Sequence, residues 1–161
     1  MRHDRLPEPE PPATIGTVGF RFADIADQSA IRSTSRAFRA YLDGVGLCAG
    51  DADLAEFLLV EALNNVAEHA YMGLPAGPFW VRANAGTMEV LAEIEDCGHA
   101  LPAKKLPGAD LPTTDGPLAT LPEGGFGWAL LHRHCHVLRY QRHSGRNHLF
   151  LGLPVNGFGL V

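Results

Sequence analysis

Apolar and polar positions follow a helical period in two stretches of the first half of the chain. Between 26 and 41, apolar side chains keep to one side and arginines to the other, which predicts an amphipathic helix that ends near Gly44. Asp51 or Asp53 is placed to cap a second helix, which is predicted to run from 54 to about 71.

Short stretches of β-branched and aromatic residues predict strands before and after these helices. The stretches are 14–22, which indicates an edge strand, and 79–84, 88–94, 137–142 and 148–153, which form two hairpins. A third helix is predicted from 125 to about 135. This order is typical of an α/β (α+β) two-layer sandwich, with a mixed, mostly antiparallel sheet and about three helices on one face.

Proline-rich segments interrupt the pattern at two places. Residues 1–14 carry four prolines among charges, and we expect a flexible tail because this segment cannot bury enough apolar surface to fold. Residues 99–123 contain five prolines, and long segments of this kind inside a domain are usually lids or disordered. We therefore expect residues 15–161 to form a single domain with a lid at about 99–123.

Composition and charge exclude several classes of protein. A length of 161 residues, 46% hydrophobic residues and a net charge of -5 fit one soluble globular domain. No apolar run approaches the ~18 residues of a membrane span and no secretory signal is evident, so the expected location is the cytoplasm. The acidic balance argues against direct binding to nucleic acid. The three cysteines lack C-x-x-C spacing, which is typical of reduced thiols.

Polar side chains form a row on the second predicted helix. Glu61, Asn65 and His69 stand one turn apart, and a solvated helix face is the common explanation for such a row. Two adjacent asparagines in a helix interior cost about 1 kcal/mol relative to alanine, which makes an unselected surface less favourable. The side-chain carbonyl of Asn65, beside the carboxylate of Glu61, would suit a hard cation such as Mg²⁺.

Two further segments combine glycines with a possible ligand contact. Asp96 ends a predicted strand and precedes Gly98, so its carboxylate is expected where another molecule can approach the backbone closely; an ordinary turn is the alternative. Gly125 and Gly127 begin the third helix, where free N–H groups can receive a phosphate; a flexible hinge is the alternative. The sequence contains neither a P-loop nor a G-x-G-x-x-G motif.

The three segments occur in an order that resembles a known family. EALNNVAEHAY, EIEDCG and EGGFGWALL, followed by a hairpin with GRNHLFL, are similar to the boxes of the RsbW/SpoIIAB-type anti-sigma factor serine/threonine kinases of the GHKL superfamily of ATPases. The resemblance covers about residues 18–153. It implies a Bergerat-type sandwich that binds ATP and Mg²⁺ between the helices and a lid.

The resemblance also implies roles for individual residues. Glu61 matches the glutamate that orients or deprotonates the attacking hydroxyl, and Asn65 matches the asparagine that holds Mg²⁺ on the phosphates. Asp96 matches the aspartate that accepts a hydrogen bond from the adenine amino group. The other residues expected to bind the nucleotide are His69, Gly98, Gly125, Gly127 and Asn147.

Partners are implied by the same resemblance. In this family the phosphoryl acceptor is an anti-anti-sigma (STAS-type) protein, the second partner is a sigma factor, and homodimers are common, here expected through the exposed sheet. Two positions depart from the family pattern, with Ala100 in place of a glycine and Gly124 in place of an arginine. They keep open a catalytically weak module that acts by protein binding. A bare ATPase with a moving lid is a further alternative.

Overall fold

The computed structural model describes residues 19–109 and 126–157 of the chain. Its elements are β1 (Phe20–Ile25), α1 (Gln28–Gly44), α2 (Ala49–Asn65), the π-helix η1 (Val66–Ala70), β2 (Pro78–Ala85), β3 (Glu89–Asp96), the 3-10 turn η2 (Pro102–Lys104), α3 (Phe126–His134), β4 (Val137–His143) and β5 (Arg146–Pro154). This is the predicted order. The predicted tail, the larger part of the predicted lid, Gly124 and Gly125 lie outside the described residues.

The strands form one sheet in the order β1-β2-β3-β5-β4. Every neighbouring pair is antiparallel, so the mostly antiparallel sheet that the sequence predicts is antiparallel throughout the described strands. β1 lies at an edge, as predicted. The two predicted hairpins are β2–β3 and β4–β5, and the second turns at Ser144 and Gly145, which both have positive φ, 49° and 82°, as a two-residue hairpin requires. Because β3 pairs with β5, Asp96 lies opposite Asn147.

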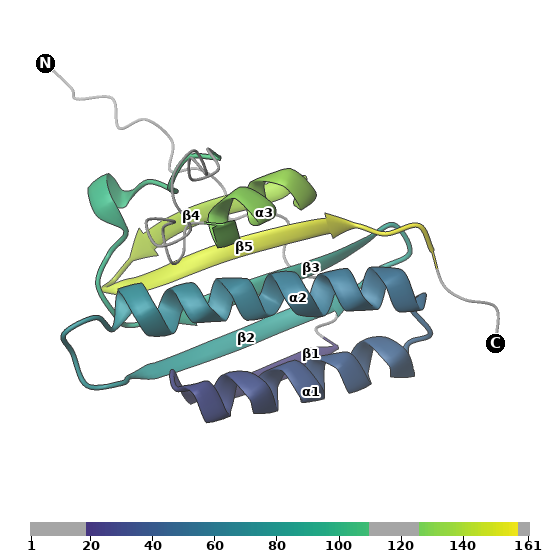
Figure 1. The fold of residues 1–161 in the computed structure, drawn as a ribbon, viewed down its shortest axis with the longest axis horizontal. Coiled ribbons are helices and arrows are strands. Elements are labelled where there is room, and N and C mark those ends of the chain that lie inside the picture. Colours follow the sequence, from purple (N-terminus) through teal and green to yellow (C-terminus); the bar gives the residue numbers. More distant parts are fainter. Residues whose placement is uncertain (1–18, 110–125, 158–161) are drawn as a thin grey trace, which may run out of the picture.

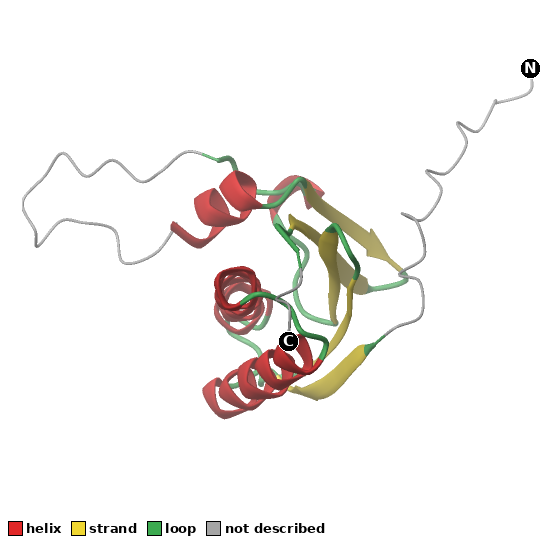
Figure 2. Cartoon of the chain, turned by 90° about the vertical axis from the view of Figure 1, so that its right-hand side faces the viewer, coloured by secondary structure: helices red, strands yellow, loops and turns green. Residues whose placement is uncertain are grey.

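The helices lie together on one face of this sheet, as Figures 1 and 2 show. α1 and α2 lie side by side in Figure 1, and Phe38, Leu42, Leu59 and Leu63 of these helices are buried almost completely. Alternate residues of the strands pack against these helices. Burial of each large apolar side chain stabilises the fold by about 1.5–3 kcal/mol. The sheet residues of this core are Phe79, Val81, Ala83, Val90, Ala92, Ile94, Leu149, Leu151 and Leu153. The α+β sandwich expected from the sequence is confirmed.

The second helix differs from the prediction at its start. It begins at Ala49 rather than 54, so Asp51 lies inside its first turn and does not cap it. Asp51 is buried and binds the chain after β5 instead, accepting hydrogen bonds from Asn156 N (2.7 Å) and Asn156 Nδ2 (3.1 Å). Cys48 Sγ donates to the same carboxylate at 3.1 Å. The first turn of α2 is thus tied to the C-terminal end of the sheet.

The end of the same helix also departs from regular geometry. α2 ends at Asn65, and Val66–Ala70 continues it as a π-helix, with Tyr71 N donating to Val66 O at 3.3 Å. A π-turn holds an extra residue, so the expected regular row of Glu61, Asn65 and His69 does not continue unchanged past Asn65. Such turns are frequent at functional sites.

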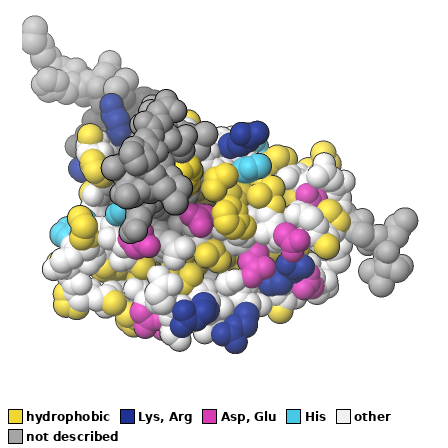
Figure 3. Space-filling model, viewed as in Figure 1, with side chains coloured by type: hydrophobic (Ala, Val, Ile, Leu, Met, Phe, Trp, Pro, Cys, Tyr) yellow, Lys and Arg dark blue, Asp and Glu magenta, His cyan; other side chains and the backbone are white. Residues whose placement is uncertain are grey.

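The outer surface of the helical layer carries charges along α1 (Figure 3). Arg32 and Arg36 are exposed there, as expected for a solvated face. Arg39 forms ion pairs with three carboxylates, those of Asp43, Asp53 and Glu56. Among the residues that the structure describes, no helix combines the length and the apolar character needed to cross a membrane.

Candidate functional site

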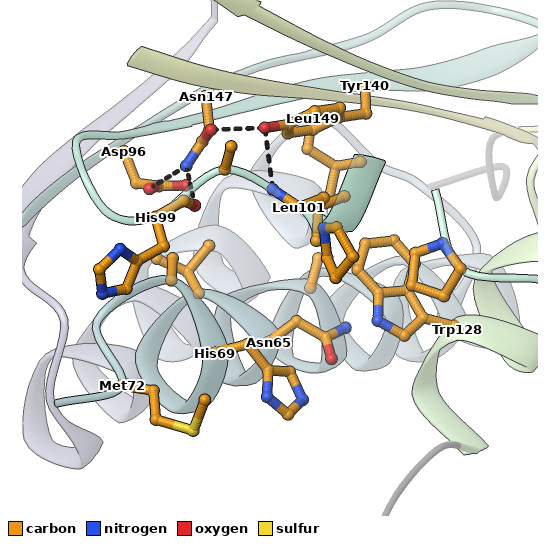
Figure 4. A pocket seen from close by; sticks show the side chains of 16 residues that line it. Asn65, His69, Met72, Asp96, His99, Leu101, Trp128, Tyr140, Asn147 and Leu149 are labelled. Carbon is orange, nitrogen blue, oxygen red and sulfur yellow. Dashed lines mark hydrogen bonds between the residues drawn. The ribbon is translucent and has the colours of Figure 1, made fainter. Parts of the chain in front are cut away.

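A cavity of about 450 Å³ opens between the end of α2, the ends of β3 and β5, and α3. Its wall is mostly apolar, with a few polar side chains that point inward (Figure 4). The polar members are Asn65, His69, Asp96, His99, Tyr140 and Asn147. The volume and this mixture are typical of a pocket for a small molecule with specific polar groups.

Asp96 ends β3 and reaches the cavity wall with only 4% of its surface exposed. Its Oδ1 atom accepts hydrogen bonds from Gly98 N (2.8 Å) and Asn147 Nδ2 (2.7 Å). No described residue donates to Oδ2, which leaves this oxygen as an acceptor for a ligand. Burial raises the pKa of the Asp96 carboxyl, and these two hydrogen bonds with the charges of Arg142 and His148 oppose the rise.

Gly98 lies against the backbone of η1. A Cβ atom at this position would overlap the carbonyl group of Ala70, and His99 N donates to that carbonyl at 2.7 Å. The missing side chain therefore allows the strand end and the π-helix to approach each other, which brings Asp96 and the end of α2 to one cavity.

Asn65 is the last residue of α2, and its side chain lines the cavity. Its Nδ2 atom is buried and has no hydrogen-bond partner among the described residues. An unsatisfied buried donor costs about 1–3 kcal/mol, so it is explained best by a ligand that accepts from it. His69 also lines the cavity, but it is exposed, at the rim.

Glu61 lies one turn before Asn65 and faces the first turn of α3. A Cβ atom on Gly127 would stand 2.7 Å from Glu61 Oε2 and 3.7 Å from Asn65 Nδ2, so the helix start approaches both side chains closely. Glu61 and Gly127 are not part of the cavity wall and lie beside it. Burial raises the pKa of the Glu61 carboxyl, and the charge of Glu68 adds a smaller rise. A carboxylate with a raised pKa accepts a proton more readily.

Asn147 is buried behind Asp96 on β5, with 4% of its surface exposed. Its Nδ2 atom donates to Asp96 Oδ1 and to His99 O (2.9 Å). Its Oδ1 atom accepts from Tyr140 Oη and Arg142 Nη1, both at 2.6 Å. Protein groups thus use all its hydrogen-bonding capacity, so Asn147 acts on the cavity through Asp96.

The structure brings together most of the residues expected from the sequence. Asn65, His69, Asp96 and Asn147 line one cavity, with Gly98 behind it and Glu61 and Gly127 beside Asn65. Gly125 lies outside the described residues. Sequence reasoning missed Trp128, Tyr140 and Arg142. Trp128 lies in the cavity wall (Figure 4), and its position after Gly127 was the available signal, whereas no sequence signal marked the two residues of β4.

The groups around the cavity fit a nucleotide with Mg²⁺. The apolar wall suits a base, and Asp96 Oδ2 suits an amino group on that base. Asn65 offers an amide oxygen beside the Glu61 carboxylate, and oxygen ligands are those that Mg²⁺ prefers. The unpartnered Asn65 Nδ2 and the exposed start of α3 can meet phosphate oxygens.

Comparisons with known proteins give a matching family and one solved structure that supports the fold. Residues 25–152 match the family model described as the histidine kinase-like ATPase domain. The crystal structure of the RsbU and RsbW domains of Rv1364c from Mycobacterium tuberculosis is similar, with a TM-score of 0.56 and 17% identity over 88% of this chain and 35% of that chain. The Acinetobacter baumannii histidine kinase AdeS is similar with a TM-score of 0.44 and 17% identity, over 84% of this chain and 68% of that chain.

The likeness to solved structures concerns the fold. The chain spans about a third (35%) of the length of the Mycobacterium tuberculosis chain. No curated protein sequence matches it.

Proposed function

The chain belongs to the histidine kinase-like ATPase domain family, and we propose that it is a protein kinase that transfers the γ-phosphoryl group of ATP to a serine or threonine of a partner protein. The observation that carries this proposal is the close approach of Glu61 to Gly127, beside the unpartnered amide of Asn65. A proton acceptor thus lies next to a helix start that is suited to a phosphate, beside the cavity.

The proposed reaction is an in-line displacement. The hydroxyl oxygen of the acceptor forms a bond to the γ-phosphorus, the bond from that phosphorus to the β–γ bridging oxygen breaks, and ADP leaves with the electron pair. The hydroxyl proton passes to the Glu61 carboxylate, whose raised pKa strengthens it as a base. Phosphoryl transfer needs mainly positioning and charge neutralisation, so one base and few other groups suffice.

Asn65 is the proposed ligand of Mg²⁺ through Oδ1. Mg²⁺ bound there would neutralise charge on the phosphates. Asp96 would accept from the amino group of adenine, and the N–H groups at Gly125 and Gly127 would donate to the phosphates. His69, at the rim of the cavity, is proposed to contact the nucleotide from the solvent side.

The proposed partners are an anti-anti-sigma (STAS-type) protein as phosphoryl acceptor and a sigma factor that the protein sequesters in the cytoplasm. The support is the resemblance of the sequence to anti-sigma factor kinases, with the RsbW domain named for one structure of similar fold. The acidic balance of the chain, with 13 Lys and Arg against 18 Asp and Glu, favours a protein partner over nucleic acid.

We further propose a homodimer through the sheet face that the helices leave open. Trp80 and Phe150 lie on this face, each under an arginine: Arg146 is 5.0 Å from the Trp80 ring centre and Arg139 is 5.5 Å from that of Phe150. A face with aromatic groups and charges of both signs can pair with its own copy. Sedimentation velocity tests it: the Phe150→Asp variant should be a monomer, and a wild-type monomer at high concentration would exclude the dimer.

The kinase proposal is tested with γ-labelled ATP and a candidate acceptor, taken from a native lysate by pull-down with and without ATP. Label should reach a serine or threonine of the acceptor, and Glu61→Gln should abolish this transfer while ATP still binds. Glu56→Gln is the control. It makes the same change of charge on the same helix, about 8 Å from Glu61 along the helix axis, and should leave transfer intact.

Other outcomes identify the alternatives. ATP-dependent capture of a partner without transfer of label would indicate the catalytically weak binding module. Release of free phosphate without any acceptor would indicate an ATPase. Transfer that persists in Glu61→Gln would contradict the role assigned to this carboxylate.

A further inference from the structure

Three neighbouring strands place Arg142, Asn147 and Asp96 in one row. Arg142 of β4 is the register partner of Asn147 on β5, and Asn147 is in turn the partner of Asp96 on β3. Tyr140 stands two residues before Arg142, on the same side of β4. The row thus runs from the outer edge of the sheet to the cavity.

Hydrogen bonds within this row allow only one orientation of the Asn147 amide. Two donors, Tyr140 Oη and Arg142 Nη1, lie 2.6 Å from Asn147 Oδ1. Tyr140 Oη accepts from Leu101 N at 3.1 Å, so its own proton is free to point at Asn147. An amide turned over would set an N–H group against Arg142, which cannot accept, and would leave the Tyr140 hydroxyl proton without its acceptor. Asn147 Nδ2 is therefore held toward Asp96 Oδ1, at 2.7 Å (Figure 4).

Arg142 also holds the turn that follows Asp96. Its Nη1 atom donates to Gly98 O at 2.9 Å, and Gly98 N donates to Asp96 Oδ1 at 2.8 Å. Asp96 Oδ1 thus receives two donors whose positions both depend on Arg142. The other oxygen of Asp96, Oδ2, remains available to accept a hydrogen bond from the ligand.

We propose that Arg142 and Tyr140 are positioning residues for base selection: by fixing the amide of Asn147 they keep Asp96 a hydrogen-bond acceptor, which selects a purine with a 6-amino group over one with a 6-oxo group. This inference rests on the proposed binding of a purine nucleotide in the cavity. Arg142 acts without touching the base, because it is not part of the cavity wall, whereas Tyr140 lines the wall and acts through its hydroxyl group on Asn147.

The consequence of losing the two donors follows from the chemistry of the amide. Without these donors, only the acceptors Asp96 Oδ1 and His99 O still orient the amide. In the fraction that turns over, Asn147 Oδ1 would face Asp96 Oδ1, and two facing acceptors favour a proton between them. A protonated Asp96 can donate to a 6-oxo group. Loss of the donors is therefore expected to relax selection between the two kinds of purine rather than only to weaken binding.

The test measures the dissociation constants of Mg-ATP and Mg-ITP for the full chain by titration calorimetry. Wild type should prefer ATP. Arg142→Met should lower the preference about tenfold or more, the change expected when one hydrogen bond to a charged group is lost. Tyr140→Phe removes only a hydroxyl group and should lower it in the same direction, which covers the case of a misfolded Arg142 variant.

Arg36→Met is the matched control, because it removes one exposed positive charge on α1, away from the row. It should keep the wild-type preference. Equal weakening of both nucleotides in Arg142→Met and Tyr140→Phe, or no change in either, would overturn the inference while leaving the proposed function intact. A wild-type chain that binds neither nucleotide would refute the proposed function itself, and the base selection with it.

Discussion

The buried amide of Asn65 predicts that the protein gives up stability to hold a nucleotide. Asn65 Nδ2 has no partner among the described residues, so the ligand-free protein bears the cost of an unsatisfied donor, about 1–3 kcal/mol. Asn65→Ala removes this donor. We expect the ligand-free variant to be more stable than wild type, and unable to hold Mg-ATP.

Asn64→Ala provides the reference for the magnitude. Asn64 lies beside Asn65 in the last turn of α2, and it is absent from the cavity wall. Both substitutions gain the same helix propensity, at most about 0.7 kcal/mol. The difference between the two variants therefore reports the buried amide alone, about 1 kcal/mol or more. For a chain of this length, that corresponds to about 2–4 °C in Tm per kcal/mol.

Thermal unfolding with and without Mg-ATP measures both effects. Without nucleotide, Asn65→Ala should unfold at a higher temperature than Asn64→Ala. With nucleotide at about 100 times Kd, wild type and Asn64→Ala should gain about 2.7 kcal/mol, and Asn65→Ala should gain little. The reasoning is refuted by an Asn65→Ala variant that is no more stable than Asn64→Ala, or one that ATP stabilises equally.

Three further predictions concern Glu61, Gly127 and Asp51. Burial and the charge of Glu68 raise the pKa of Glu61, so Glu68→Gln should lower that pKa. The pH at which the rate of phosphoryl transfer rises should then be lower than in wild type. An unchanged rate–pH profile would show that Glu68 does not act on Glu61. Gly127→Ala should reduce phosphoryl transfer, because its Cβ would stand 2.7 Å from Glu61 Oε2. Gly50→Ala in α2 is the control and should keep full activity, because its Cβ would have nothing within 4 Å. Equal transfer activity of the two variants would contradict this packing. Burial tends to raise the pKa of Asp51, but hydrogen bonds from Cys48 and Asn156 lower it overall. The ionised carboxylate therefore stabilises the fold fully above its ordinary pKa of about 4, and this stabilisation is lost as the pH falls through the lowered pKa. Asp51→Ala should thus lower the free energy of unfolding in urea by about 1–3 kcal/mol at neutral pH, and by less in strong acid. An equal loss at both pH values would argue against a stabilising role of the ionised carboxylate.

The order of the elements could be predicted because each strand and helix carries its own pattern. The two hairpins and the edge position of β1 followed from local composition alone. The start of α2 could not be predicted in this way, because Asp51 is a good helix cap in isolation and only the folded chain brings Asn156 to its carboxylate. The π-turn after Asn65 has no sequence pattern of its own, and Ala70 at its end lies against Gly98, which is distant in the sequence.

The candidate site shows the same division. The spacing of Glu61 and Asn65 predicted that they share one helix face, and the local sequence placed Asp96 at a strand end. That these groups belong to one pocket was implied by the resemblance to a known family. The roles of Tyr140 and Arg142 needed the register of three strands, since alternation along β4 shows which face a residue occupies but not which side chain lies across from it.

The most direct test of the account is a calorimetric titration of the full chain with Mg-ATP, for wild type and Asp96→Asn. The variant keeps the size of the side chain, but either orientation of its amide sets an N–H group against another donor, that of the base or those of Asn147 and Gly98. The account predicts saturable binding by wild type and a loss of roughly 10-fold to 150-fold in the variant. Equal affinity of the two proteins, or no binding of ATP by wild type, would contradict it.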